Sequence, residues 1–200
     1  FHIVSQIGYM LFGLSLYSVA GVAAAVFFIV HQIPVKTALF LVNGLVETLT
    51  GTAALRRLGG LVRRTPLTAG LFLLAALSLA GLPPFSGFFG KLALIDAGFA
   101  AEAWLVTAIS LGVSILTLYS MTKIWSGVFW GVPDEPPPLP AAAGDGPLTA
   151  PRLMNGATVG LVALTLAIAV FAQALWALCE RAAQDILAPS EAYIDVVLRP

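Results

Sequence analysis

The chain has 200 residues, of which 59% are hydrophobic and 10% are charged, whereas soluble domains are roughly 45–50% apolar and about 25% charged. Its ten basic and ten acidic residues cancel, so no overall charge indicates a nucleic acid or a strongly charged substrate. The single cysteine, Cys179, excludes an intrachain disulfide framework and a cysteine-based metal cluster. The composition therefore predicts a protein of the lipid bilayer with no nucleic-acid partner.

Five apolar segments are candidates to cross a bilayer, which takes about 20 residues of helix. The first, residues 3–18, is preceded by neither an initiator methionine nor a signal-peptide pattern, so we expect a fragment that begins within a transmembrane helix. The next two, residues 19–49 and 66–99, are too long for a perpendicular crossing and must tilt or break. Residues 104–128 and 153–178 follow. The pattern predicts an all-α, polytopic membrane protein with about five transmembrane helices.

The stretches between these segments indicate the topology. The loop from Arg56 to Arg64 carries four arginines and no acid, so the positive-inside rule predicts that it is cytoplasmic. Alternation then puts a linker rich in Pro, Gly and Ala, residues 131–152, on the same side and the C-terminal tail, residues 179–200, outside. None of these stretches is long enough to form a separate catalytic domain.

The third segment is interrupted by the stretch LAGLPPFSGFFGK, whose helix-breaking and polar residues are Pro83, Pro84, Ser86, Gly87 and Lys91. Because proline lacks a backbone N–H, we expect a discontinuous helix, broken near residues 82–87, with carbonyl groups that face protein or water. Lys91 precedes Glu102 by about 16 Å of helix and so lies near the bilayer centre, where an ionisable group costs about 2.5–3.5 kcal/mol and indicates function. The Ser86 hydroxyl can donate or accept there, and Gly87 leaves room for water or a neighbouring helix.

The second segment also carries polar residues, in the stretch HQIPVKTALFLVNG. Lys36 precedes the end of the segment by about 20 Å of helix, so Lys36 and His31 are both deep in the membrane. They lie about 140° apart around a regular helix, although Pro34 between them loosens the turn and lets both face one hydrated channel. Histidine titrates near neutral pH, and burial destabilises a charged lysine, so these residues and Lys91 predict proton translocation.

Other chemistry has no counterpart in the sequence. We find no phosphate loop, zinc spacing, nucleophile elbow or haem-type histidine pair, so we expect no cofactor and no bound metal. Glu47, Asp96 and Lys123 are expected near the membrane surfaces, and His2 carries no assignment.

Four stretches together resemble a known family: SQIGYM, HQIPVKTALFLVNG, LGGLVRRTPLTAGLF and LAGLPPFSGFFGK. They are similar to the antiporter-like membrane subunits that Mrp-type sodium/proton antiporters share with respiratory complex I. The resemblance implies two inverted five-helix repeats, each with a broken helix, of which residues 1–178 are the second, the last five of fourteen helices. It also implies that Lys91 is the ionisable residue of the broken helix and that His31 and Lys36 belong to a central polar axis. Gln32 departs from the adjacent pair of histidines common in the family.

Within the family, LPPFSGFFGK and the ending SEAYIDVVLRP resemble the D-type subunits of Mrp antiporters best. This implies a proton-translocating subunit in the cell membrane, a secondary transporter and not an enzyme, with protons, sodium ions, lipid and other membrane subunits as partners. A proton-pumping subunit of complex I or of a membrane-bound hydrogenase would use the same residues under a different driving force. A structural scaffold subunit, whose lysines pair with carboxylates of its neighbours, is the remaining alternative.

Overall fold

The structure is a computed structural model that describes residues 2–133, 148 and 150–187. These residues form helices and the turns between them, with no β-strand among them, so the expected all-α class is confirmed. The long helices are α1 (His2–Ser15), α2 (Val19–Thr50), α4 (Pro66–Ala80), α5 (Ser86–Ala100), α6 (Trp104–Trp125), α7 (Arg152–Val170) and α8 (Ala172–Leu187). The short elements are η1 (Leu55–Arg57), α3 (Leu61–Arg64) and the π-helical turn η2 (Ser126–Trp130).

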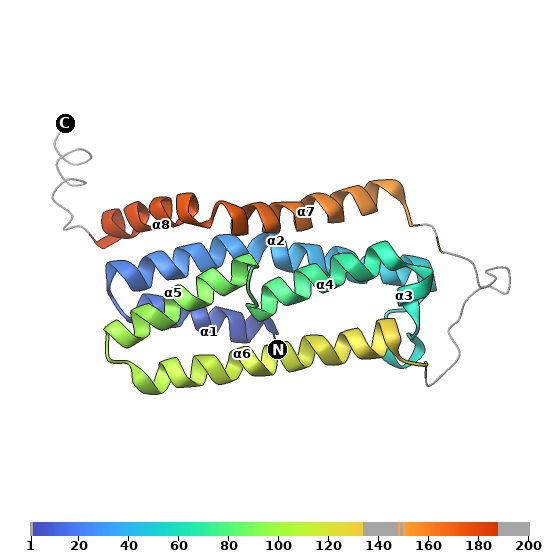
Figure 1. Ribbon diagram of the computed structural model, residues 1–200, viewed down its shortest axis with the longest axis horizontal. Coiled ribbons are helices and arrows are strands. Elements are labelled where there is room, and N and C mark those ends of the chain that lie inside the picture. Colours follow the sequence, from blue (N-terminus) through green and yellow to red (C-terminus); the bar gives the residue numbers. More distant parts are fainter. Residues whose placement is uncertain (1, 134–147, 149, 188–200) are drawn as a thin grey trace.

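Helix α2 is the axis against which α1, α4, α5, α7 and α8 pack (Figure 1). Its 32 residues span about 48 Å, more than the roughly 30 Å of a hydrocarbon core. The Ser18 hydroxyl accepts from the Gly21 N–H at 3.1 Å and caps the start of the helix. Helix α2 continues through Pro34 without interruption, so its faces keep a regular helical arrangement.

Helices α4 and α5 lie end to end along α2, separated by residues 81–85 (Figure 1). This is the expected discontinuous helix, and its existence is confirmed. Helix α6 contacts both halves. The break is therefore enclosed by α2 and α6 rather than left to lipid on every side.

Helices α7 and α8 also lie end to end and meet at Phe171 (Figure 1). The sequence indicated a segment that ends near residue 178, but helical structure continues to Leu187. Cys179 and Ala183, one turn apart on α8, are buried in an apolar cluster with side chains of α2. This packing stabilises α8. The helix was not evident from the sequence, because its other faces carry charged residues.

In the part of the chain that the structure describes, three helices are individually long and apolar enough to cross a membrane: α2, α6 with η2, and α7. Helix α4 is apolar but shorter, so a crossing there needs α4 and α5 together. Helix α1 has 14 residues. The chain is a multi-pass membrane protein, as its composition predicted, and the number of complete crossings is approximate.

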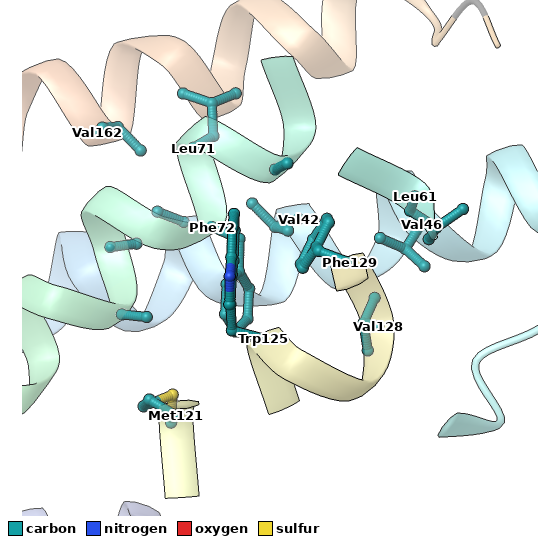
Figure 2. Close-up of a cluster of buried hydrophobic side chains, with 14 of the residues drawn as sticks. Val42, Val46, Leu61, Leu71, Phe72, Met121, Trp125, Val128, Phe129 and Val162 are labelled. Atoms are coloured by element: carbon teal, nitrogen blue, oxygen red, sulfur yellow. The ribbon is translucent and has the colours of Figure 1, made fainter. Parts of the chain in front are cut away.

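An aromatic cluster joins α4 to the end of α6 (Figure 2). The ring centroids of Phe72 and Trp125 are 6.2 Å apart, those of Phe72 and Phe129 are 5.3 Å apart, and those of Trp125 and Phe129 are 4.7 Å apart. Trp125 and Phe129 both reach Phe72 because residues four apart share a helical face. The cluster fixes α6 against the first half of the broken helix.

Phe129→Ala should destabilise the fold, because a side chain that is 1% exposed would leave a cavity in this cluster. We expect a loss of about 3 kcal/mol, the lower end of the range for buried phenylalanine, since packing rather than exclusion of water drives helix association in lipid. Thermal unfolding of the solubilised complex, followed by size-exclusion chromatography, measures the change. Phe171→Ala, at a side chain that is 65% exposed, is the control, and equal losses in both variants would contradict the packing account.

Candidate functional site

The break between α4 and α5 begins at a glycine. Gly81 has a φ of 83°, a left-handed conformation that residues with a Cβ disfavour. Its N–H donates to the carbonyls of Leu77 and Ser78 at 3.1 and 3.2 Å, which ends α4. Pro83 and Pro84 follow, joined by a cis peptide bond, and cannot donate to a continuing helix. Glycine and prolines together therefore separate the two halves.

Lys91 binds a carbonyl group that the break leaves free. Its Nζ donates to the Ala80 carbonyl oxygen at 2.8 Å and to Ser114 Oγ of α6 at 2.9 Å, and it lies 5.2 Å from the centroid of the Tyr9 ring. The last carbonyls of a helix lack intrahelical donors and carry the negative end of the helix dipole, which stabilises a cation, as an aromatic face does. The break thus supplies uncharged ligands for an ammonium group on a side chain that is 4% exposed.

His31 of α2 contacts the other side of the break. Its Nδ1 lies 2.8 Å from Ser86 Oγ, which lies 3.1 Å from Ser78 Oγ, so hydrogen bonds connect α2 to both halves of the broken helix. All three side chains are fully buried. His31 Nε2 has no hydrogen-bond partner among the described residues. Ser86 therefore orients the imidazole ring through one nitrogen, and the other is available to exchange a proton.

Gly87 lies where α5 approaches α4 and α2. A Cβ at this position would overlap the Ser78 carbonyl oxygen and lie 2.9 Å from His31 Nε2. The sequence indicated room here for water or for a neighbouring helix, and the structure fills that room with neighbouring backbone and the imidazole ring. The absent side chain of Gly87 is therefore a condition for the close packing of the two half-helices.

Lys36 lies apart from both of these hydrogen-bonded groups. Its side chain is half-buried, and in the part of the chain that the structure describes no hydrogen bond joins it to Lys91 or His31. It interacts electrostatically with His31, as Lys91 does, and also with His2 of α1. The structure thus brings Lys91 and His31 to the break through different partners and connects Lys36 to His31 by charge alone.

Polar residues of α1 also reach the interior, which the sequence interpretation missed. The His2 ring is hydrogen-bonded to Ser120 Oγ at 2.9 Å, and Gln32 Nε2 donates to Gln6 Oε1 at 3.1 Å. The signal was available, because His2, Gln6 and Tyr9 recur at positions i, i+4 and i+7 of an apolar segment and so share one helical face. That face points toward α2 and α6, where polar side chains meet it.

The arrangement suits the binding and release of protons. The ammonium of Lys91 has uncharged acceptors, so its neutralisation leaves no buried carboxylate unpaired.

Among the described residues, no group of three or more His, Cys, Asp and Glu side chains is arranged to hold a metal ion.

A comparison with known proteins identifies the family. Residues 2–117 match the family model of the transmembrane domain of NADH:quinone oxidoreductases and Mrp antiporters. The chain belongs to this family. The matched residues include the whole break, Lys91, His31 and Lys36, so the candidate site lies within the shared domain.

Individual relatives agree with this membership. The D-type subunit of the Na+/H+ antiporter of Alkalihalophilus pseudofirmus is 41% identical over 199 residues, which cover 100% of this chain and 39% of that protein. A chain of the Mrp complex from a Dietzia species has a TM-score of 0.85 and 36% identity, over 98% of this chain and 43% of that one. A chain of respiratory complex I from Thermus thermophilus has a TM-score of 0.51 and 21% identity, over 88% of this chain and 44% of that one, and shows a shared fold alone.

These matches confirm the resemblance to D-type Mrp subunits that the sequence motifs indicated. The chain spans about two fifths of the length of the antiporter protein that it matches. The two relatives that match over the full length of this chain, from Alkalihalophilus pseudofirmus and Bacillus subtilis, carry the names of antiporter subunits and not of enzymes.

Gly87→Ala should strain the site, because the new methyl group would displace the Ser78 carbonyl and the His31 ring. We expect the complex to lose about 1–3 kcal/mol, the usual cost of overpacking a core. Gly70→Ala is the matched control in the same broken helix, where a Cβ would meet nothing within 4 Å and alanine favours the helix. Thermal unfolding compares the two, and equal melting temperatures would mean that α5 moves aside without cost.

Proposed function

We propose that this chain is the C-terminal repeat of a proton-translocating subunit of a multisubunit sodium/proton antiporter. The observation that carries the proposal is the Lys91 ammonium group, buried at a helix break between the Ala80 carbonyl and Ser114 Oγ. A buried charge at this depth is costly and is retained where it has a function. The similarity to D-type subunits of sodium/proton antiporters supports ion exchange as the activity of the whole protein.

In the proposed mechanism, Lys91 is the switch at the end of the proton route. Its ammonium group gives a proton to water at the break, near residues 83–87, becomes a neutral amine, and is later protonated again. His31 and Lys36 transmit charge along the central axis toward the other repeat. Like charges repel strongly where the dielectric constant is low, so a proton that arrives at Lys36 favours release from Lys91. The repulsion couples the two events.

The proposal includes an orientation in the membrane. The loop from Arg56 to Arg64 lies in the cytoplasm by the positive-inside rule, and in Figure 1 this loop lies at the same end of the molecule as the start of α7. Alternation then puts the linker, residues 131–152, inside and the C-terminal tail outside. Residues 134–147 and 149 of the linker and residues 188–200 of the tail lie outside the described residues.

The proposed partners are protons, sodium ions, the bilayer and the other membrane subunits of a cell-membrane complex. A protein segment that supplies half of a proton route needs the first repeat to complete it, and the chain matches 43% of the length of a chain in a solved Mrp complex. We assign the sodium route to another subunit or to the first repeat.

Two other functions would use the same residues differently. A redox-driven pump needs electron transfer in partner subunits, and the likeness to complex I supports only a common architecture. A scaffold subunit would pair Lys91 with a carboxylate of a neighbour, whereas the Lys91 side chain is 4% exposed and donates to two uncharged groups of its own chain. The sodium/proton antiporter is therefore the better supported function.

Sodium-induced dequenching of a pH-sensitive dye in everted vesicles tests the proposal on the complete complex. Lys91→Ala should slow the exchange about 100-fold, because a positioned proton-transfer group contributes about 10²–10⁴ to a rate. Lys123→Ala is the control at an exposed lysine near the end of α6 and should exchange at the wild-type rate. Immunoblots of the isolated complex establish that equal amounts have assembled.

Each alternative predicts a different result. If the wild-type vesicles respond only after an electron donor is added, the complex is a redox-driven pump. If Lys91→Ala reduces assembly but leaves the transport rate per assembled complex unchanged, Lys91 serves a scaffold.

A further inference from the structure

The hydroxyl group of Ser114, on helix α6, reaches the break. Ser114 Oγ accepts a hydrogen bond from Lys91 Nζ at 2.9 Å and donates one to the Ala80 carbonyl oxygen at 3.2 Å. Lys91 Nζ donates to the same carbonyl at 2.8 Å. The three groups therefore form a closed triangle, which we call the lysine clamp, and each comes from a different helix: α4, α5 and α6.

The members of the lysine clamp differ in what they can do when Lys91 changes charge. An ammonium group only donates hydrogen bonds, and a carbonyl only accepts them, whereas a hydroxyl does both and can rotate. When the ammonium loses a proton, its nitrogen gains a lone pair and needs a donor. The Ala80 carbonyl cannot supply one. The Ser114 hydroxyl can, if it turns its hydrogen from the Ala80 carbonyl to the Lys91 nitrogen.

We propose that Ser114 is a positioning residue that keeps Lys91 hydrogen-bonded in both of its protonation states and so speeds proton transfer at the break. In the charged state the hydroxyl accepts from Nζ and donates to the Ala80 carbonyl, as the structure shows. On release, one N–H bond of the ammonium breaks and the proton passes to a water molecule. The Ser114 hydroxyl then donates to the amine, and a remaining N–H group stays on the carbonyl.

The other polar side chains near Lys91 have hydrogen-bond partners of their own, so Ser114 is the group that can donate to the neutral amine. Among the described residues, Lys91 interacts with two ionisable groups of other helices, Tyr9 of α1 and His31 of α2. The Tyr9 hydroxyl also lies near Ser114, but it donates its hydrogen to the Ser110 carbonyl. His31 Nδ1 is hydrogen-bonded to Ser86. Ser114 is the hydroxyl that contacts both Lys91 Nζ and its carbonyl ligand.

The inference rests on the proposed function, and the same dequenching assay tests it with a matched set of variants in the complete complex. Ser114→Ala should slow exchange about tenfold, which corresponds to one hydrogen bond with a charged group. Ser114→Thr keeps the hydroxyl and should restore most of the rate. Ser110→Ala should have no effect, because the Ser110 hydroxyl donates to the Thr107 carbonyl of its own helix. An unchanged rate in Ser114→Ala, or a threonine variant as slow as the alanine variant at equal assembly, overturns the inference.

A spectroscopic measurement separates failure of this inference from failure of the antiporter proposal. Solid-state NMR of the complex in lipid with ¹⁵N-labelled lysine reports the hydrogen bonding of Nζ, and Lys91→Arg identifies the Lys91 signal by its loss. Ser114→Ala should move this signal, and Ser110→Ala should leave it in place. If wild-type vesicles show no sodium-driven exchange, the proposed function fails, whereas the lysine clamp still predicts the shift. A Lys91 signal that Ser114→Ala does not move overturns the clamp.

Discussion

A helix that ends inside a membrane leaves carbonyl groups that lipid cannot satisfy, and the structure depends on how one of them is bonded. The Ala80 carbonyl at the end of α4 accepts from the Lys91 ammonium group and from the Ser114 hydroxyl. An unpaired carbonyl and an unpaired ammonium would each be costly at this depth, and the hydrogen bond between them removes both costs. The break and the buried charge therefore stabilise each other. The two groups that accept hydrogen bonds from the Lys91 ammonium, the Ala80 carbonyl and the Ser114 hydroxyl, are both uncharged. This leaves the ammonium group able to lose its proton.

The long helix α2 holds this feature in position. It packs against both halves of the broken helix, and its His31 ring is hydrogen-bonded to Ser86 at the start of α5. Gly87 permits the close approach of α5 to the Ser78 carbonyl. On the opposite side, the aromatic cluster fixes α6, and with it Ser114, against α4. Geometry at the break is thus set by rigid packing on two sides, so a change in the charge of Lys91 is met by rotation of a hydroxyl group more easily than by movement of helices.

Local chemistry made part of this architecture predictable from the sequence. Pro83, Pro84 and Lys91 predicted the break and its charge, because a missing N–H and the cost of a buried ammonium are properties of single residues. The contribution of Gly81 was also accessible, since a glycine with a proline two residues later is a typical end of a helix. Ser114 was not predictable: it reaches Lys91 only because α6 is fixed beside the break by tertiary contacts, and an isolated serine in an apolar segment carries no pattern. Depth along the helix grouped Lys36 with His31, but α2 is one uninterrupted helix through Pro34, in which residues five apart lie about 140° apart around the axis.

A structure of the complete complex in lipid, at a resolution that shows lysine side chains and ordered water, tests the central claim most directly. The account predicts that Lys91 Nζ lies within hydrogen-bond distance of the Ala80 carbonyl and of Ser114 Oγ, with ordered water beside it at the break. A Lys91 side chain that instead forms an ion pair with a carboxylate of a neighbouring subunit, while the Ala80 carbonyl is bonded elsewhere, would contradict it. Lys91 would then be a structural contact between subunits, and the break would need another explanation.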